Sequence, residues 1–185
     1  RTSALYPDHY LTTHVEVRLN SNQRLEDGVW EEGRIHRVDC PNENRKIRIP
    51  RDTVLREGVL ITNCQLEFGQ GAALEDVIVL STNTTPRAID GPSSVRLGRD
   101  DGCDPGGDAQ IITLGGVNVA SGLSIFGSRI IAEGDVNFTA QADAVHGASI
   151  LSNGEIRGTA NGLAGTCGVD GMPTSFTRPY FRIVG

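Results

Sequence analysis

Apolar and polar positions alternate in short runs along the chain, and one run occurs three times between residues 111 and 158. Each copy opens with two aliphatic residues, carries glycine at its fifth place and continues with an apolar, polar, apolar or small triplet. The copies begin at Ile111, Ile130 and Ile150, 19 and 20 residues apart. The alternation predicts strands, and glycine at a fixed phase predicts a corner with positive φ. Strand, corner and strand, repeated at about 20 residues, are typical of a β-solenoid.

The same phase continues upstream, with weaker copies that start near residues 36, 60 and 79. The second and third of these place Cys64 and Asn83 at the corner, and Asn tolerates the left-handed region. The sequence therefore predicts an all-β protein, a short single-stranded parallel β-helix of roughly six coils. A β-sandwich of short strands is the alternative, which explains the strand spacing but not the constant phase of glycine.

Coils that stack in register place equivalent residues in columns, so the three copies also predict which side chains point inward. The inward column expected from the triplets consists of Val117, Val136 and Ile156, and the next, outward column of Asn118, Asn137 and Arg157.

The repeat divides the chain into three parts. Residues 33–160 form the predicted solenoid, with a loop insertion near residues 84–109. Residues 1–32 are expected to be an N-terminal cap or linker, with Trp30 packed near the junction, and residues 161–185 a C-terminal cap or strand. Caps are expected because an uncovered end coil can pair with other chains.

Cys40 and Cys64 occupy equivalent places one predicted coil apart. Neighbouring strands lie about 4.8 Å apart, which falls inside the Cα separation that a disulfide needs, roughly 4.4 to 6.8 Å. We therefore expect a Cys40–Cys64 disulfide, and a Cys103–Cys167 pair follows by elimination. Two disulfides indicate a compartment outside the cytoplasm, whereas buried free thiols remain the alternative.

The insertion contains an acidic, glycine-rich segment, residues 98–108, which we predict to be a binding loop because solenoid insertions often bind ligands. Its candidate binding residues are Arg99, Asp100, Asp101, Asp104 and Asp108. Asp100, Asp101 and Asp104 offer the hard oxygen ligands that calcium prefers. The segment does not match an EF-hand loop, and Asp and Gly are common in ordinary turns. Calcium is thus the one cofactor to consider, and none is otherwise expected.

The net charge and the absence of known motifs argue against several classes of function. The net charge of −6 gives no reason to expect binding to nucleic acid or to an anionic membrane. No apolar run is long enough to span a membrane. The sequence has no nucleophile elbow, zinc-protease or phosphate-loop motif. Roughly six coils would extend only about 29 Å, which is short for a polysaccharide cleft. We therefore predict a protein that is not an enzyme, with a small carbohydrate-active β-helix protein, similar to lyases or hydrolases, as the alternative.

Three segments resemble a known family: Gly33 to Cys40, Arg96 to Cys103, and Ser128 to Thr159. They are similar to the C-terminal region of alphaproteobacterial TadG-like proteins, in the TadE/TadG group associated with Flp (tight-adherence) pili. The resemblance covers most of residues 33–167 and includes the placement of all four cysteines. It implies a protein anchored by an N-terminal membrane helix, projecting outside the inner membrane and acting in pilus assembly or adhesion. Neither that helix nor a von Willebrand-like domain is present in this sequence.

The residues and the resemblance together predict an extracytoplasmic domain, in the periplasm or at the cell surface, anchored to the membrane in the full-length protein. Its expected role is to display loops, above all residues 98–108, on a rigid solenoid. The expected partners are other pilus or envelope proteins, or a surface glycan. A structural subunit that polymerises end to end is a further alternative, and it requires an uncovered coil at either end.

Overall fold

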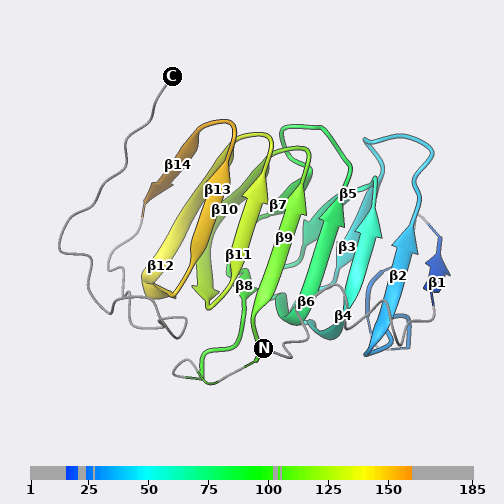
Figure 1. The fold of residues 1–185 in the computed structure, drawn as a ribbon, viewed down its shortest axis with the longest axis horizontal. Coiled ribbons are helices and arrows are strands. Elements are labelled where there is room, and N and C mark those ends of the chain that lie inside the picture. Colours follow the sequence, from blue (N-terminus) through cyan, green and yellow to red (C-terminus); the bar gives the residue numbers. More distant parts are fainter. Residues whose placement is uncertain (1–15, 21–23, 27, 102–103, 105, 160–185) are drawn as a thin grey trace.

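The computed structural model describes residues 16–20, 24–26, 28–101, 104 and 106–159 (Figure 1). Within these residues the chain is all-β and has no helix. The strands are β1 (Glu16–Leu19), β2 (Arg34–Val38), β3 (Lys46–Ile49), β4 (Val54–Thr62), β5 (Gln65–Phe68), β6 (Ala73–Ser81), β7 (Ile89–Gly91), β8 (Arg96–Leu97), β9 (Ala109–Thr113), β10 (Val117–Phe126), β11 (Arg129–Ala132), β12 (Val136–His146), β13 (Ser149–Ser152) and β14 (Ile156–Thr159).

All of these strands pair in parallel, and they form three faces around one core. Face 1 contains β1, β2, the second halves of β4 and β6, then β9, β11 and β13. Face 2 contains β3, β5, β7, the first parts of β10 and β12, and β14. Face 3 contains the first halves of β4 and β6, then β8 and the ends of β10 and β12. The predicted parallel β-solenoid is therefore confirmed, and the sandwich alternative is wrong.

The solenoid has about seven turns, one more than the sequence predicted. The additional strand is β1, which pairs with β2 through Glu16 and Ile35. Its segment has neither the aliphatic pair nor the corner glycine of the repeat, so the pattern did not reveal it. Residues 1–15 of the predicted N-terminal cap and residues 161–185 of the predicted C-terminal cap lie outside the described residues.

The predicted columns are present. Val117 pairs with Val136, which pairs with Ile156. The column of starting residues also runs as expected, and from β2 to β13 it consists of His36, Leu60, Val79, Ile111, Ile130 and Ile150. Its members from Leu60 to Ile130 are buried. The phase of the sequence repeat thus gave the strand register directly, because parallel coils stack residue on residue.

The predicted role of the repeated glycine is wrong. Gly115, Gly134 and Gly154 are absent from the glycines with positive φ. They are needed because the backbones of successive coils approach closely at this corner: a Cβ on Gly134 would lie 2.8 Å from the carbonyl carbon of Gly115. The left-handed residues lie at the other end of face 1, just before its strands, where Glu57 and Gly127 have φ of 40° and 58°.

Gly134→Ala should lower the free energy of unfolding by about 2 kcal/mol, because the new methyl group must push two coil backbones apart. Urea denaturation of both proteins measures the difference. Glu133→Ala, at the exposed neighbouring position, is the control and should change the free energy by less than about 0.5 kcal/mol. Equal effects of the two substitutions would show that the corner has room for a side chain.

Candidate binding surfaces

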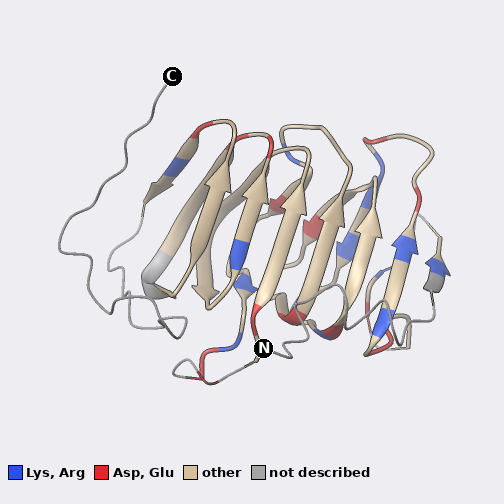
Figure 2. Ribbon diagram, in the orientation of Figure 1, with Lys and Arg blue, Asp and Glu red and all other residues tan. Residues whose placement is uncertain are grey.

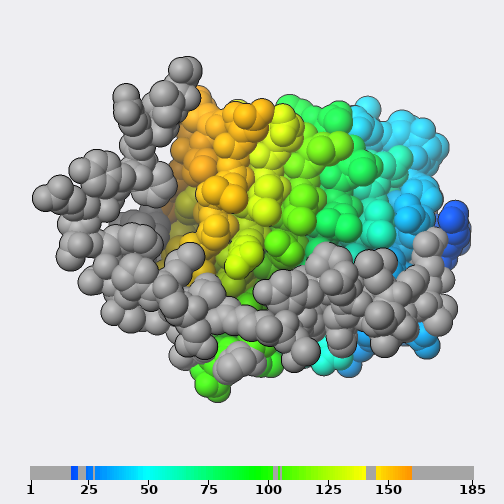
Figure 3. Space-filling model, viewed as in Figure 1, coloured from blue at the N-terminus to red at the C-terminus, as the bar shows by residue number. Residues whose placement is uncertain are grey.

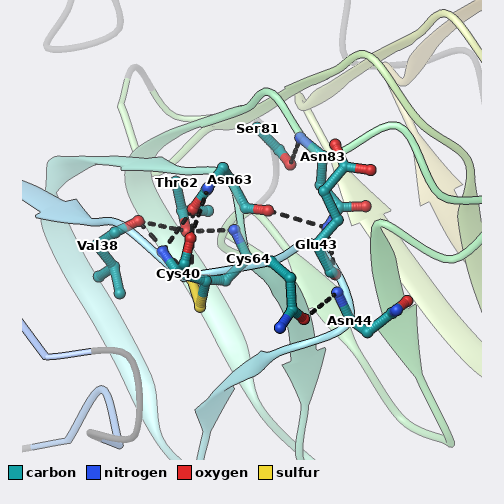
Figure 4. Close-up of a disulfide and its surroundings, with 10 residues drawn as sticks. Val38, Cys40, Glu43, Asn44, Thr62, Asn63, Cys64, Ser81 and Asn83 are labelled. Carbon is teal, nitrogen blue, oxygen red and sulfur yellow. Dashed lines mark hydrogen bonds between the residues drawn. A yellow bond between two sulfur atoms is a disulfide. The ribbon is translucent and has the colours of Figure 1, made fainter.

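A disulfide joins Cys40 and Cys64 at the corner between faces 1 and 2, with their Cα atoms 5.3 Å apart. This confirms the predicted pair (Figure 4). Asn63 reinforces the corner, since its Oδ1 accepts the Cys40 N–H at 2.6 Å and its Nδ2 donates to the Cys40 carbonyl at 2.9 Å. The corner is therefore held by a covalent link and by side chains that satisfy buried main-chain groups.

Hydroxyl groups stabilise the same corner in several coils, a feature that the sequence analysis missed. Thr62 Oγ1 accepts the N–H of Cys64 at 2.9 Å, and Thr113 Oγ1 accepts that of Gly115 at 3.1 Å. Equivalent bonds are made by Ser81 and Ser152. The signal was Ser or Thr at the third place of the repeat, two residues before the corner, where a hydroxyl can satisfy a turn N–H.

Replacing both Cys40 and Cys64 by Ser should lower the free energy of unfolding by about 3 kcal/mol, because the link restrains a loop of this length in the unfolded chain. The two cysteines are 24 residues apart in the sequence. Urea denaturation gives the energy, and peptide mapping without reduction identifies the pair. Recovery of unlinked Cys40 and Cys64 peptides from protein made in an oxidising compartment would contradict the assignment.

The predicted binding loop, residues 98–108, folds back on itself and on face 3. Arg99 Nε lies 2.7 Å from Asp101 Oδ2, and Asp101 Oδ1 accepts the N–H of Asp104 at 3.2 Å. Gly107 N–H donates to Asp76 Oδ1 at 2.8 Å, which ties the loop to a coil corner. The loop is the bottom-most excursion of the chain in Figure 1, between β8 and β9.

The loop residues do not converge on one site among the described residues. Asp100 and Asp104 are exposed, whereas Asp101 and Asp108 are half-buried. The described part of the chain contains no group of three or more His, Cys, Asp or Glu side chains that could hold a metal ion, and calcium at Asp100, Asp101 and Asp104 stays a prediction. Cys103 and Cys167 lie outside the described residues, and their predicted disulfide stays a prediction.

Face 3 carries an ion cluster that the sequence did not indicate. The buried carboxylate of Glu75 lies between two guanidinium groups, 3.0 Å from Arg56 Nε and 2.7 Å from Arg96 Nη2. Arg56 and Glu75 are partners in the strand register, and Arg96 comes from the next coil. The cluster ties adjacent coils together and leaves the carboxylate fully paired.

His36 is buried in the first coils, where Trp30 covers it. The two rings stack with centroids 4.0 Å apart, and His36 Nε2 accepts the N–H of Glu31 at 3.0 Å. Nδ1 has no hydrogen-bond partner of ordinary geometry. Burial lowers the pKa of His36 to about 4, although the nearby Glu31 carboxylate and the Val59 main chain oppose the shift. His36 is therefore neutral in the folded protein near pH 7, and Trp30 lies at the junction as predicted.

The folded protein should lose stability as the pH falls from about 6.5 to about 4, because the unfolded chain then binds a proton at His36 that the folded chain does not. The loss from this group should approach about 3 kcal/mol at the lower end. Chemical denaturation across this range, for the wild type and His36→Gln, isolates the contribution as the difference between the two curves. Parallel curves would show that His36 accepts a proton freely in the folded state.

The outward side of face 1 carries a row of aliphatic side chains, which we call the outer stripe. It consists of Ile61, Leu80, Ile112, Ile131 and Leu151, which are register partners in five successive coils. Leu151 is 58% exposed, and Leu114, beside the stripe at the corner, is 52% exposed. Figure 2 shows that this side of the solenoid has few charged residues over β6, β9 and β13. Ile61 and Leu80 pack against a small buried cluster of Val59 and Ile78 on this outward side. Ile112, Ile131 and Leu151 belong to neither hydrophobic cluster of the described residues, so the need to fill the interior does not explain them.

The predicted outward column of face 2 is also present, through the pairs of Asn118 with Asn137 and Asn137 with Arg157. Asn118 Nδ2 donates to Asp90 Oδ1 at 2.8 Å. A shallow groove of about 510 Å³ runs over this column on β10, β12 and β14. The core is more open at this end, because Val117 and Val136 are buried and Ile156 is 46% exposed. End-to-end assembly through this coil stays a hypothesis.

None of the described residues forms a helix that is both long and apolar enough to cross a lipid bilayer. A family model described as "Domain of unknown function (DUF7867)" matches residues 2–168 of the chain. No curated protein and no solved structure matches it.

Proposed function

Because the chain belongs to the DUF7867 family, whose description assigns no activity, we propose its function from its surface geometry. The protein is a non-enzymatic, extracytoplasmic binding module of a pilus-assembly or surface-adhesion protein. It docks onto another envelope or pilus protein through the outer stripe. The observation that carries the proposal is the run of aliphatic side chains at one outward position in five successive coils.

A protein partner fits this surface better than a glycan. Strands of a solvated face normally alternate apolar residues inside with polar residues outside. In β11 the inward Ile130 is followed by the outward Ile131, which breaks that rule. The stripe is half-buried from Ile61 to Ile131 and exposed at Leu151, and apolar patches on a protein surface are characteristic of protein contacts. Face 2, with its amides and Arg157, is the surface better suited to sugar hydroxyls, and it is not part of the proposed contact.

The non-enzymatic part of the proposal rests on where the titratable groups lie. The pKa of His36 is shifted far from its ordinary value, but this side chain is buried beneath Trp30 and is not accessible to a substrate. The carboxylate of Glu75 is held by Arg56 and Arg96 in an ion cluster. The Cys40–Cys64 disulfide supports the extracytoplasmic part, because such links persist mainly in oxidising compartments.

Replacing both Leu114 and Leu151 by Asp should reduce surface pili and adhesion of the producing bacterium about tenfold or more, because two carboxylates in an apolar contact must lose their hydration. Pili are counted by electron microscopy, and adhesion is measured as retained cells. The amount of folded protein reaching the envelope is measured in the same cells, so that a loss of expression is recognised.

The matched control replaces Ala120 and Thr139 by Asp. Both are exposed on the other side of the solenoid, so the control changes the net charge equally without touching the stripe. It should leave pili and adhesion at wild-type levels. If the stripe variant behaves like this control, the protein does not act through the outer stripe.

A further inference from the structure

We infer that the outer stripe binds a single amphipathic α-helix of the partner protein, which lies across the strands of face 1. This inference rests on the proposed function, because it specifies the partner at the same surface. The helix presents one row of apolar side chains to the stripe, acidic side chains on the flank that meets Arg129 and basic side chains on the flank that meets Glu133.

The width of the stripe favours a helix. In the coils of β9, β11 and β13 the neighbouring outward column is polar and consists of Gln110, Arg129 and Ser149. On the other side the corner positions are Leu114, Glu133 and Asn153, so only Leu114 widens the apolar surface. A helix of a globular protein carries an apolar row of similar width, and helix-in-groove contacts use such rows. A sheet would need a broad apolar face.

The length of the stripe also suits a helix. In the three coils with polar flanks, two strand spacings separate Ile112 from Leu151, which gives about 10 Å at about 4.8 Å each. A helix rises about 1.5 Å per residue, so about seven residues, or two turns, cover this distance. The strand-end half of face 1, which carries the stripe, is open to view in Figure 3 on the coils of β9, β11 and β13.

Charges on the two flanks have opposite signs. Arg129 is exposed, and its guanidinium makes no ion pair or hydrogen bond with any residue that the structure describes. Glu133, across the stripe, is exposed and accepts a hydrogen bond from Asn153 Nδ2 at 2.7 Å, which leaves its charge uncompensated. A helix with one acidic and one basic flank therefore binds in one direction only. The apolar row supplies the affinity, and the charges fix the orientation.

A second copy of the chain fits this surface less well. Stable protein dimers bury about 800 Å² on each partner, whereas the stripe is one to two residues wide, and in the coils of β9, β11 and β13 five of its six neighbouring positions are polar. Two copies stacked face to face would also confront polar columns that have no pairing partner, which costs desolvation.

The test uses fluorescein-labelled helical peptides of about 18 residues and measures anisotropy with the complete chain. One peptide carries a leucine row with a Glu flank and a Lys flank, and a second has the same composition with the leucines dispersed around the helix. The first should bind about tenfold more tightly than the second. Leu114→Asp with Leu151→Asp should remove this difference, whereas Ala120→Asp with Thr139→Asp should change it by less than about twofold.

Charge reversal tests the flank assignment. Arg129→Glu should weaken the first peptide about threefold, and a third peptide with Lys on both flanks should then become the preferred ligand, because exposed ion pairs contribute little each. Equal binding of the row and dispersed peptides, no binding of either, or an unchanged flank preference in Arg129→Glu would overturn the inference. So would a dimer, seen by analytical ultracentrifugation of the unliganded chain, that the stripe substitutions dissociate.

The two proposals can fail separately. If the stripe substitutions abolish pili but the peptides bind without preference, the surface contacts a partner that is not helical, and the inference is wrong while the proposed function stands. If the peptides bind as expected but cells with the stripe substitutions keep normal pili, the helix site exists and the proposed function is wrong.

Discussion

The structure depends on the fixed distance between stacked parallel strands. Each coil must lie one strand spacing from the next, so every residue is directly beside its equivalent in the neighbouring coil. Side chains in one inward column must therefore share a size, as Val117 and Val136 do. The corner at Gly115 and Gly134 shows the same constraint acting on the backbone, because the coils approach too closely there to admit a Cβ. The same spacing between coils brings Cys40 and Cys64 close enough to form the disulfide.

Outward columns are free of this packing constraint, which makes their composition informative. On face 3 the outward side chains form the ion cluster around Glu75, and on face 2 they form the polar column that contains Asn118. Face 1 differs because its outward row is aliphatic. Ile61 and Leu80 pack against the buried Val59 and Ile78, whereas Ile112, Ile131 and Leu151 belong to neither hydrophobic cluster of the described residues, so an external contact is a physical reason for keeping these three apolar.

The sequence was sufficient for the architecture because the inward columns repeat. The phase set by Ile111, Ile130 and Ile150 gave the register, and the same phase gave the Cys40–Cys64 pair. The left-handed corner was missed because no single residue type marks it: Glu57 fills it in one coil and Gly127 in another. β1 was assigned to the N-terminal cap and not to a coil, because an end strand has a neighbour on one side only, which relaxes the pattern.

The surface was harder to predict for a different reason. Each copy of the repeat begins with two adjacent aliphatic residues, and a strand turns one of them inward and the next outward. The outer stripe was thus visible in the sequence as the second member of each pair, but the sequence analysis assigned a face only to the triplets and not to the aliphatic pairs. The binding loop was predicted from its place in an insertion and from its acidic residues, and the carboxylate of Asp101 is held within the loop by Arg99 and by the N–H of Asp104.

Each described strand pairs only with strands of the adjacent coils, and this has a mechanical consequence. Paired strand residues are separated by 17 positions at the least, from Leu123 to Ala140, and the coil from Val77 to Ala109 is the longest interval between paired residues. In a Cys167→Ser variant, which lacks the predicted Cys103–Cys167 link, a tension applied to the C-terminal end would therefore peel off one coil at a time, starting at β14, without disturbing the coils behind it. The peeling would stop at Cys40–Cys64, where a covalent bond crosses between coils. Under such a tension the C-terminal coils unfold one after another, whereas the coils joined by Cys40–Cys64 stay linked.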